Sequence, residues 1–339
     1  MLRLEEETTL RILQECLHAS EQDQVMIISD TGEHSSRLAA SYAQSAKFLK
    51  APLQHIIQEP QTELSEANEE LINVLTKLPE KNIVILTVSN KLGTLGKLGK
   101  SFRRFCQQRK HRFISTTGLG ILRTETFSAM MAAMDVDYGR MHMHGVWLKR
   151  QIDNASSIRL TTTAGTDVTA DIFGMQSTCN AGYFQGHGTG GNIPAGEVYI
   201  APRGISNVNG TVVIDGSMRT DQGGKLLSNP IIMTIKRGRV ISLDGKEAPI
   251  LEESLKRAEQ HAKYPERVRI IGEIGIGINP NAQLIGTTIV DEKVMNTAHI
   301  ALGSNYWFGG ANRTVFHADQ VFKNPKLFLD GKEISYMQQ

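Results

Sequence analysis

The sequence predicts an α/β protein of two domains, an N-terminal open sheet that is largely parallel and a C-terminal α+β domain rich in antiparallel strands. Three observations predict this fold. A chain of 339 residues suits two cores of ordinary size. Apolar strand-like runs alternate with helical segments in the first half, and β-branched runs separated by Gly, Asn and Asp-Gly turns fill the second.

The N-terminal half repeats one pattern, a short apolar run followed by a helical segment. Because parallel strands need crossover connections, this alternation predicts parallel strands joined by helices. The predicted strands are Val25–Asp30, Pro52–Ile57, Ile83–Val88 and Phe113–Thr117. The predicted helices cover about 35–48, 63–78 and 97–108, and a further one covers about 125–151.

The second domain begins where β-branched residues take over, at Ser157 to Thr163. We therefore divide the chain into residues 1–153 and 154–339. One helix, about Ile250–Ala262, interrupts the strands of the second domain. The predicted strands there include Asp167–Ile172, Glu197–Ile200, Gly210–Asp215, Ile231–Ile235 and Arg239–Leu243.

Composition excludes several classes of protein. Basic and acidic residues number 37 and 35, so no strong charge favours nucleic acid, and the basic run Lys97–Arg112 is typical of a solvated helix face. The three cysteines form no CxxC pair, which fits a reducing compartment. The N-terminus is acidic where a signal peptide is basic, and no apolar stretch is long enough for a membrane span. We expect a soluble, cytoplasmic protein that binds neither nucleic acid nor membrane.

Two glycine-rich segments look like nucleotide-binding loops, but each departs from the motif that it resembles. In Gly93 to Ser101 the first glycine comes one place too early for a P-loop, so we expect a plain turn between strand and helix. In Gly272 to Gly277 a carboxylate, Glu273, would repel a pyrophosphate, and Asn279-Pro280 opposes a helix start. This segment is better interpreted as a strand that presents Glu273 to positive charge.

His317 and Asp319 lie two residues apart in a segment of strand composition. Residues two apart in a strand share a face, so both side chains can converge on one ion. Upstream, His299, Glu273 and Glu197 also stand in the C-terminal half. Three of the five lie among small or apolar residues, where an unpaired charge is costly.

Five segments in this half resemble the metal-site segments of the aminopeptidase T family, and they occur in the same order. They are NIPAGEVYIAP, GEIGIGINP, DEKVMNTAHIALGSNY, GGANRTVFHADQVF and LFLDGKEI. The chain is identified as a short member of that family, which includes the AmpS-type leucyl aminopeptidases.

The resemblance implies a metallo-aminopeptidase, a hydrolase that removes N-terminal residues from short peptides. It implies a cocatalytic pair of divalent ions (Zn, Co, Mn or Mg) and a homodimer. It assigns catalytic roles to Tyr306, as a hydrogen-bond donor to the oxyanion, and to Glu273. The implied ligands are Glu197, Glu273, His299, His317 and Asp319.

Two alternatives stay open at this stage. A histidine such as His299 with His317 and Asp319 would make the two-histidine, one-carboxylate triad of non-haem Fe(II) oxygenases. The scaffold also resembles that of a ring-cleaving dihydroxypyridine dioxygenase, although Glu197 and Glu273 favour the peptidase. The other alternative is a non-catalytic binding protein on the same scaffold.

Asp291, Glu292 and Lys293 lie close in sequence to His299. We interpret them as a solvated turn with a local ion pair.

Overall fold

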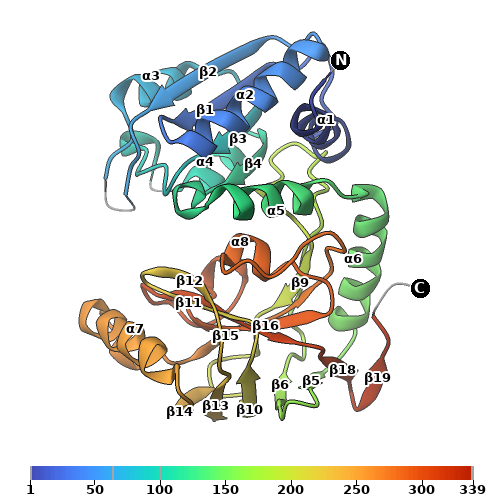
Figure 1. The fold of residues 1–339 in the computed structure, drawn as a ribbon, viewed down its shortest axis with the longest axis vertical. Coiled ribbons are helices and arrows are strands. Elements are labelled where there is room, and N and C mark those ends of the chain that lie inside the picture. Colours follow the sequence, from blue (N-terminus) through green and yellow to red (C-terminus); the bar gives the residue numbers. More distant parts are fainter. Residues whose placement is uncertain (1, 63–64, 100, 337–339) are drawn as a thin grey trace. The chain divides into compact units, whose positions relative to one another are not determined.

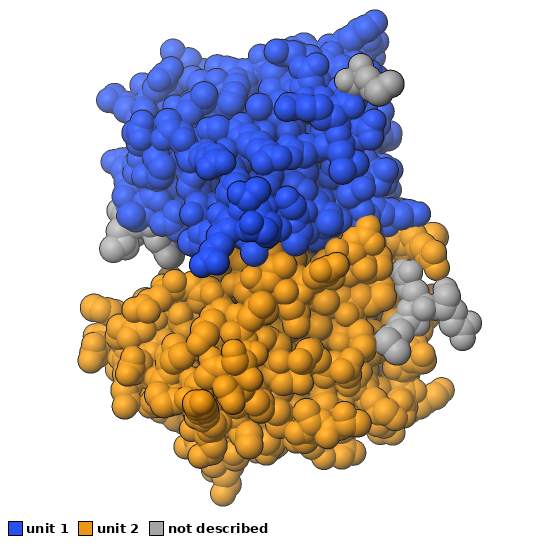
Figure 2. All heavy atoms as spheres, viewed as in Figure 1, with its two compact units in different colours: residues 1–139, 182–195 blue, residues 140–181, 196–339 orange. Residues whose placement is uncertain are grey.

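The computed structural model describes residues 2–62, 65–99 and 101–336. Its chain forms two compact units, Met1–Gly139 with Gly182–Ala195, and Arg140–Ala181 with Gly196–Gln339 (Figure 2). These units differ from the division that we placed at residue 153. The helix before that point belongs almost wholly to the second unit, and the chain returns once to the first.

A five-stranded parallel sheet of order β2-β1-β3-β4-β8 forms the centre of the first unit (Figure 1). Register is continuous, with Val25 opposite Leu53 on one side and Ile83 on the other. The strands are β1 (Val25–Asp30), β2 (Leu53–Gln58), β3 (Ile83–Thr87), β4 (Arg112–Thr116) and β8 (Gly190–Asn192). The parallel sheet expected from the alternating pattern is confirmed.

Helices bury both faces of this sheet, which is why β1 and β3 have no exposed residue. Met26 and Ile28 point to one face and pack with Leu71 and Phe105 of two helices. The other face lies under α2, which contacts β1, β2 and β3. The helices are α1 (Leu4–Arg11), continued by a π-helical turn (Ile12–Cys16), α2 (Glu33–Phe48), α3 (Glu69–Lys77), α4 (Phe102–Gln108) and α5 (Thr124–Met134).

Three predicted helices differ from those observed. The segment 125–151 is two helices, α5 and α6 (Tyr138–Asp153), because Asp135 leaves the helical conformation and pairs with Arg11 at 2.7 Å. The segment 97–108 is a 3₁₀ turn (Gly96–Leu98) and α4, which begins after Ser101. The segment 63–78 contains the shorter α3, which begins at Glu69 after its N-cap Asn68. Residues 63, 64 and Lys100, parts of this predicted helix and of the glycine loop, lie outside the described residues.

Two seven-stranded antiparallel sheets form the second unit. The first has the order β14 (Arg239–Asp244), β13 (Ile231–Lys236), β10 (Val208–Ile214), β6 (Asp167–Asp171), β5 (Ser157–Thr161), β18 (Lys326–Leu329) and β19 (Lys332–Ile334). The second has the order β12 (Gly223–Leu226), β11 (Ser217–Thr220), β17 (His317–Lys323), β16 (Thr297–Gly303), β15 (Ile271–Gly277), β9 (Glu197–Ile200) and β7 (Thr178–Asn180).

The two sheets of the second unit pack on one another where β10 contacts β17. Helix α7 (Ala248–His261) lies against β11 and β14, and the short α8 (Thr288–Asp291) contacts β11. Strands β15 and β16 are buried along their whole length. The predicted α+β class, rich in antiparallel strands, is confirmed. No helix in the described part of the chain is long and apolar enough to span a membrane.

Candidate metal centre

Four neighbouring strands of the second sheet, β9, β15, β16 and β17, carry the predicted ligands. In antiparallel pairs, residues directly opposite each other share a face, and so do residues two apart. Ala301 lies opposite both Glu273 and Asp319, which places these two carboxylates on one face. The register extends this face to all five predicted ligands, which are Glu197, Glu273, His299, His317 and Asp319.

Glycine makes room for the central imidazole. Gly275 lies opposite His299, and a Cβ atom at residue 275 would stand 2.0 Å from His299 Nε2. The ring therefore lies across the glycine, with its side chain 0% exposed. The glycines around Glu273 that look like a nucleotide fingerprint thus serve close packing in a sheet.

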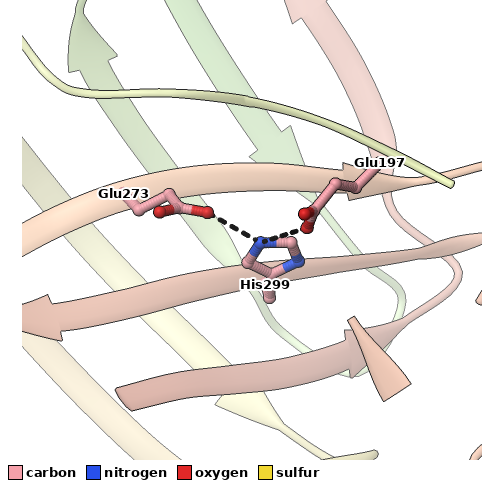
Figure 3. Close-up of side chains that lie close together, drawn as sticks. All are labelled: Glu197, Glu273 and His299. Atoms are coloured by element: carbon pink, nitrogen blue, oxygen red, sulfur yellow. Dashed lines mark hydrogen bonds and ion pairs between the residues drawn. The ribbon is translucent and has the colours of Figure 1, made fainter. Parts of the chain in front are cut away.

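Glu273 is the carboxylate that joins the two halves of the cluster. Its Oε1 lies 3.2 Å from His299 Nε2, and its Oε2 lies 3.7 Å from His317 Nε2. Glu197 Oε2 approaches the same His299 nitrogen from the other side, at 3.8 Å (Figure 3). Two groups with converging donor atoms result, and both contain Glu273: Glu197, Glu273 and His299 form one, and Glu273, His317 and Asp319 form the other.

The second group contains a buried carboxylate oxygen that has no hydrogen-bond donor. Asp319 Oδ1 lies 3.3 Å from His317 Nε2, yet it accepts no hydrogen bond of good geometry. His317 Nδ1 is occupied by the carbonyl oxygen of Ser304 at 2.9 Å, which leaves Nε2 for the cluster. A buried carboxylate oxygen without a donor is costly, and a cation at this place would satisfy it. The residues present therefore fit a metal ion.

Charges within the cluster shift the pKa values of its members. Burial alone would lower the pKa of His299, but Glu273 and its neighbouring carboxylates raise it to about 9. Burial alone would also lower the pKa of His317, but the charge of Asp319 outweighs burial and raises this pKa to about 10. Burial raises the pKa of Glu273, whereas the charge of His317 outweighs burial at Asp319 and lowers that pKa far below its usual value. Each imidazole thus stands in a strongly negative field.

Lys293 and Glu292 extend the cluster, and sequence reasoning missed both. The Lys293 side chain is 0% exposed and donates hydrogen bonds to Glu197 Oε1 and Glu292 Oε1. Burial raises the pKa of Glu292 to about 8. The interpretation of this segment as a solvated turn is wrong, because Lys293 follows α8 directly into the interior. Lys293 follows Asp291 and Glu292, an acidic pair that is typical of a solvated turn, and only the fold brings Glu197 to it.

Tyr306 is not brought into the cluster. Its side chain is 62% exposed and lies under the guanidinium of Arg313, 5.3 Å from the ring centre. It occupies a short 3₁₀ turn (Tyr306–Phe308) on the connection from β16 to β17. Its role as a hydrogen-bond donor to the reacting group stays a prediction.

The family model of NicX, 2,5-dihydroxypyridine 5,6-dioxygenase, matches residues 7–337, nearly the whole chain. The chain belongs to this dioxygenase family. The sequence segments led us to the aminopeptidase T family, and the dihydroxypyridine dioxygenase was the alternative that we left open. No curated protein sequence matches the chain significantly.

Two solved structures show the same fold as this NicX-family chain. One is 2,5-dihydroxypyridine dioxygenase from Pseudomonas putida KT2440, with a TM-score of 0.75, 16% identity, and coverage of 97% of this chain and 94% of that one. The other is AmpT from Thermus thermophilus, with a TM-score of 0.65, 15% identity, and coverage of 98% and 99%. The chain therefore has the fold of both enzymes, and the scaffold that the aminopeptidase resemblance led us to expect is confirmed.

Proposed function

We propose that this cluster holds two divalent cations and that the protein is a metallo-aminopeptidase acting on short peptides. The relationship that carries the proposal is the position of Glu273, whose two oxygens face two different imidazoles at 3.2 and 3.7 Å. A carboxylate with one oxygen toward each half is the bridging ligand that a pair of cations needs. His299 and Glu197 complete one half, and His317 and Asp319 complete the other.

The donor set supports divalent cations of the hydrolytic kind. Each group offers one imidazole and two carboxylates, a mixture that suits Zn, Co, Mn or Mg. The iron site of a non-haem oxygenase takes two imidazoles and one carboxylate. Among the residues that the structure describes, neither convergent group has that composition.

The charge of the site is compatible with two cations. Burial raises the pKa of Glu292 to about 8, so near neutral pH the carboxylates of Glu197, Glu273 and Asp319 outweigh the ammonium of Lys293 by two negative charges when all are ionised. One divalent cation would leave this site neutral, whereas two would leave it positive. A positive site stabilises the negative charge that develops when a peptide carbonyl is attacked.

Each residue of the chain has a distinct task in this proposal. Bound cations would supply Lewis acidity and a water of lowered pKa. Glu273 fixes the two halves relative to one another, and Lys293 holds Glu197 by its Oε1 so that Oε2 faces His299. Ser304 holds the His317 ring through Nδ1 and directs Nε2 inward.

A dioxygenase is the second candidate, and the family match over residues 7–337 favours it. In this alternative one iron would be held by His299, His317 and Asp319, the two-histidine, one-carboxylate set that the sequence left open, and the substrate would be a dihydroxylated ring. Glu197, Glu292 and Lys293 would then have no direct role with the metal.

Metal analysis combined with turnover separates the two functions. The protein is purified without chelator, its metals are counted per chain, and aminoacyl-p-nitroanilides and short peptides are assayed with Zn, Co, Mn or Mg. Glu273→Gln is compared with Glu333→Gln. The carboxylate of Glu333 is half exposed, and its strand β19 ends the other sheet, which carries none of the predicted ligands. Two ions per chain, with hydrolysis that only Glu273→Gln abolishes, support the peptidase. One iron per chain, oxygen uptake with 2,5-dihydroxypyridine and no peptide hydrolysis overturn it.

A further inference from the structure

Two large aromatic side chains stand exposed on the connection between β16 and β17. Tyr306 is 62% exposed and Trp307 is 57% exposed. Single exposed aromatics are common on protein surfaces and need no explanation. These two differ because they follow one strand of the metal cluster and precede the next, so that their loop lies beside the candidate site.

The loop that carries them is held rigidly. Asn305 and Asn312 are both 0% exposed, and their backbones and side chains bond to one another at 2.8 and 3.0 Å. Asn305 Nδ2 also donates to Gly272 O, and Asn312 Nδ2 donates to Gly303 O, at 2.8 and 2.7 Å. A Cβ atom at Gly310 would stand 2.0 Å from the Asn305 side chain, so the loop closes tightly. These contacts hold the backbone of the loop that carries the two exposed rings.

Trp307 directly touches a residue of the metal cluster. Its ring meets His317 edge to face, with ring centres 4.8 Å apart at 70°. Behind it, Phe308 lies 5.4 Å from Trp307 and 5.1 Å from Tyr199. The result is a row of rings that ends at the imidazole facing Glu273 and Asp319.

We propose that Trp307 is a specificity-determining residue, the wall of a subsite for the aromatic or large aliphatic side chain of the substrate's N-terminal residue. The subsite rests on the proposed aminopeptidase function. Its rigid aromatic surface gains contact area with such a side chain without ordering cost, and an aromatic partner adds ring-to-ring attraction. A small side chain such as that of alanine would leave the Trp307 surface exposed.

Turnover tests the subsite through substrate preference. The ratio of kcat/KM for Phe-p-nitroanilide over Ala-p-nitroanilide is measured for the wild type, Trp307→Ala, Trp307→Phe and the control Trp147→Phe. We expect Trp307→Ala to lower this ratio about tenfold, chiefly through KM, and Trp307→Phe to retain most of it. Bound metal per chain should stay at the wild-type level in Trp307→Ala. An unchanged ratio in Trp307→Ala overturns the subsite.

Binding without turnover separates this inference from the function on which it rests. The chain has two tryptophans, so Trp147→Phe leaves Trp307 as the one fluorescent indole. We expect its fluorescence to change saturably with L-phenylalaninol and not with L-alaninol. A saturable change in a protein that hydrolyses no peptide keeps the subsite and overturns the peptidase. Peptide hydrolysis with no change for either alcohol overturns the subsite alone.

Discussion

Lys293 donates a hydrogen bond from its ammonium group to Glu197 Oε1 at a place where both side chains are buried. Burial alone would lower the pKa of Lys293, but Glu197 and Glu292 raise it above its usual value, so the lysine stays charged. The ammonium offsets part of the carboxylate charge before any cation binds. It also fixes which oxygen of Glu197 faces His299.

Replacement of Lys293 by methionine should destabilise the metal-free protein by about 3 to 5 kcal/mol, because Glu197 and Glu292 lose their buried counter-charge. The free energy of unfolding is measured in urea after removal of metals. Lys326→Met is the matched control, since Lys326 is 62% exposed and pairs with Glu333 at the surface. It should change stability by less than about 1 kcal/mol. Equal stability of the two variants would contradict the counter-charge role.

Removal of metal should lower the melting temperature of the wild type, and added Zn or Mn should restore it. A ligand that binds only the folded state stabilises it by about 2.7 kcal/mol at a hundredfold excess over Kd. Glu273→Gln should lose most of this gain, because Glu273 belongs to both converging groups. Thermal scans with and without metal test the prediction, and a full metal-induced rise in Glu273→Gln would refute the shared-ligand arrangement.

A methyl group at Gly275 should displace the imidazole of His299, since its Cβ would stand 2.0 Å from Nε2. We expect Gly275→Ala to lose metal and activity together while the secondary structure by circular dichroism persists. Gly139→Ala is the control, because a Cβ atom there meets its nearest neighbour, Asp137, at an ordinary 3.5 Å within a helix. Metal content at the wild-type level in Gly275→Ala would show that His299 is not held by this contact.

The fold and the convergence of the ligands were open to prediction because strand periodicity is local. His317 and Asp319 share a face by their spacing alone, and the apolar run at Val25 to Asp30 gives β1 with its observed bounds. The face of Glu273 is equally set by alternation along β15. For these residues the local pattern and the tertiary fold agree.

Features that depend on distant partners were not open to prediction. Lys293 meets Glu197 across 96 residues of sequence, and nothing near it marks it as buried. β8 consists of Gly190 to Asn192, a composition with poor strand propensity, and it forms because it pairs with β4. The return of the chain to the first unit therefore depends on the pairing of β8 with β4, and the counter-charge of the site depends on the contact of Lys293 with Glu197.

Acid should weaken the protein through Glu247, which belongs to neither converging group of the metal cluster. Lys225 and the backbone N–H groups of Ser228 and Asn229 bond to this carboxylate and lower its pKa to about 2, from an ordinary 4.5. Because the folded-state pKa is depressed, the stabilisation is complete above the unfolded pKa and is lost as pH falls from about 4.5 toward 2. Glu247→Gln should therefore cost about 1 to 3 kcal/mol near neutral pH and much less at acid pH. Urea unfolding of the wild type and Glu247→Gln at two pH values measures the difference. A pH-independent penalty for Glu247→Gln would mean that its hydrogen bonds matter by geometry and not by charge.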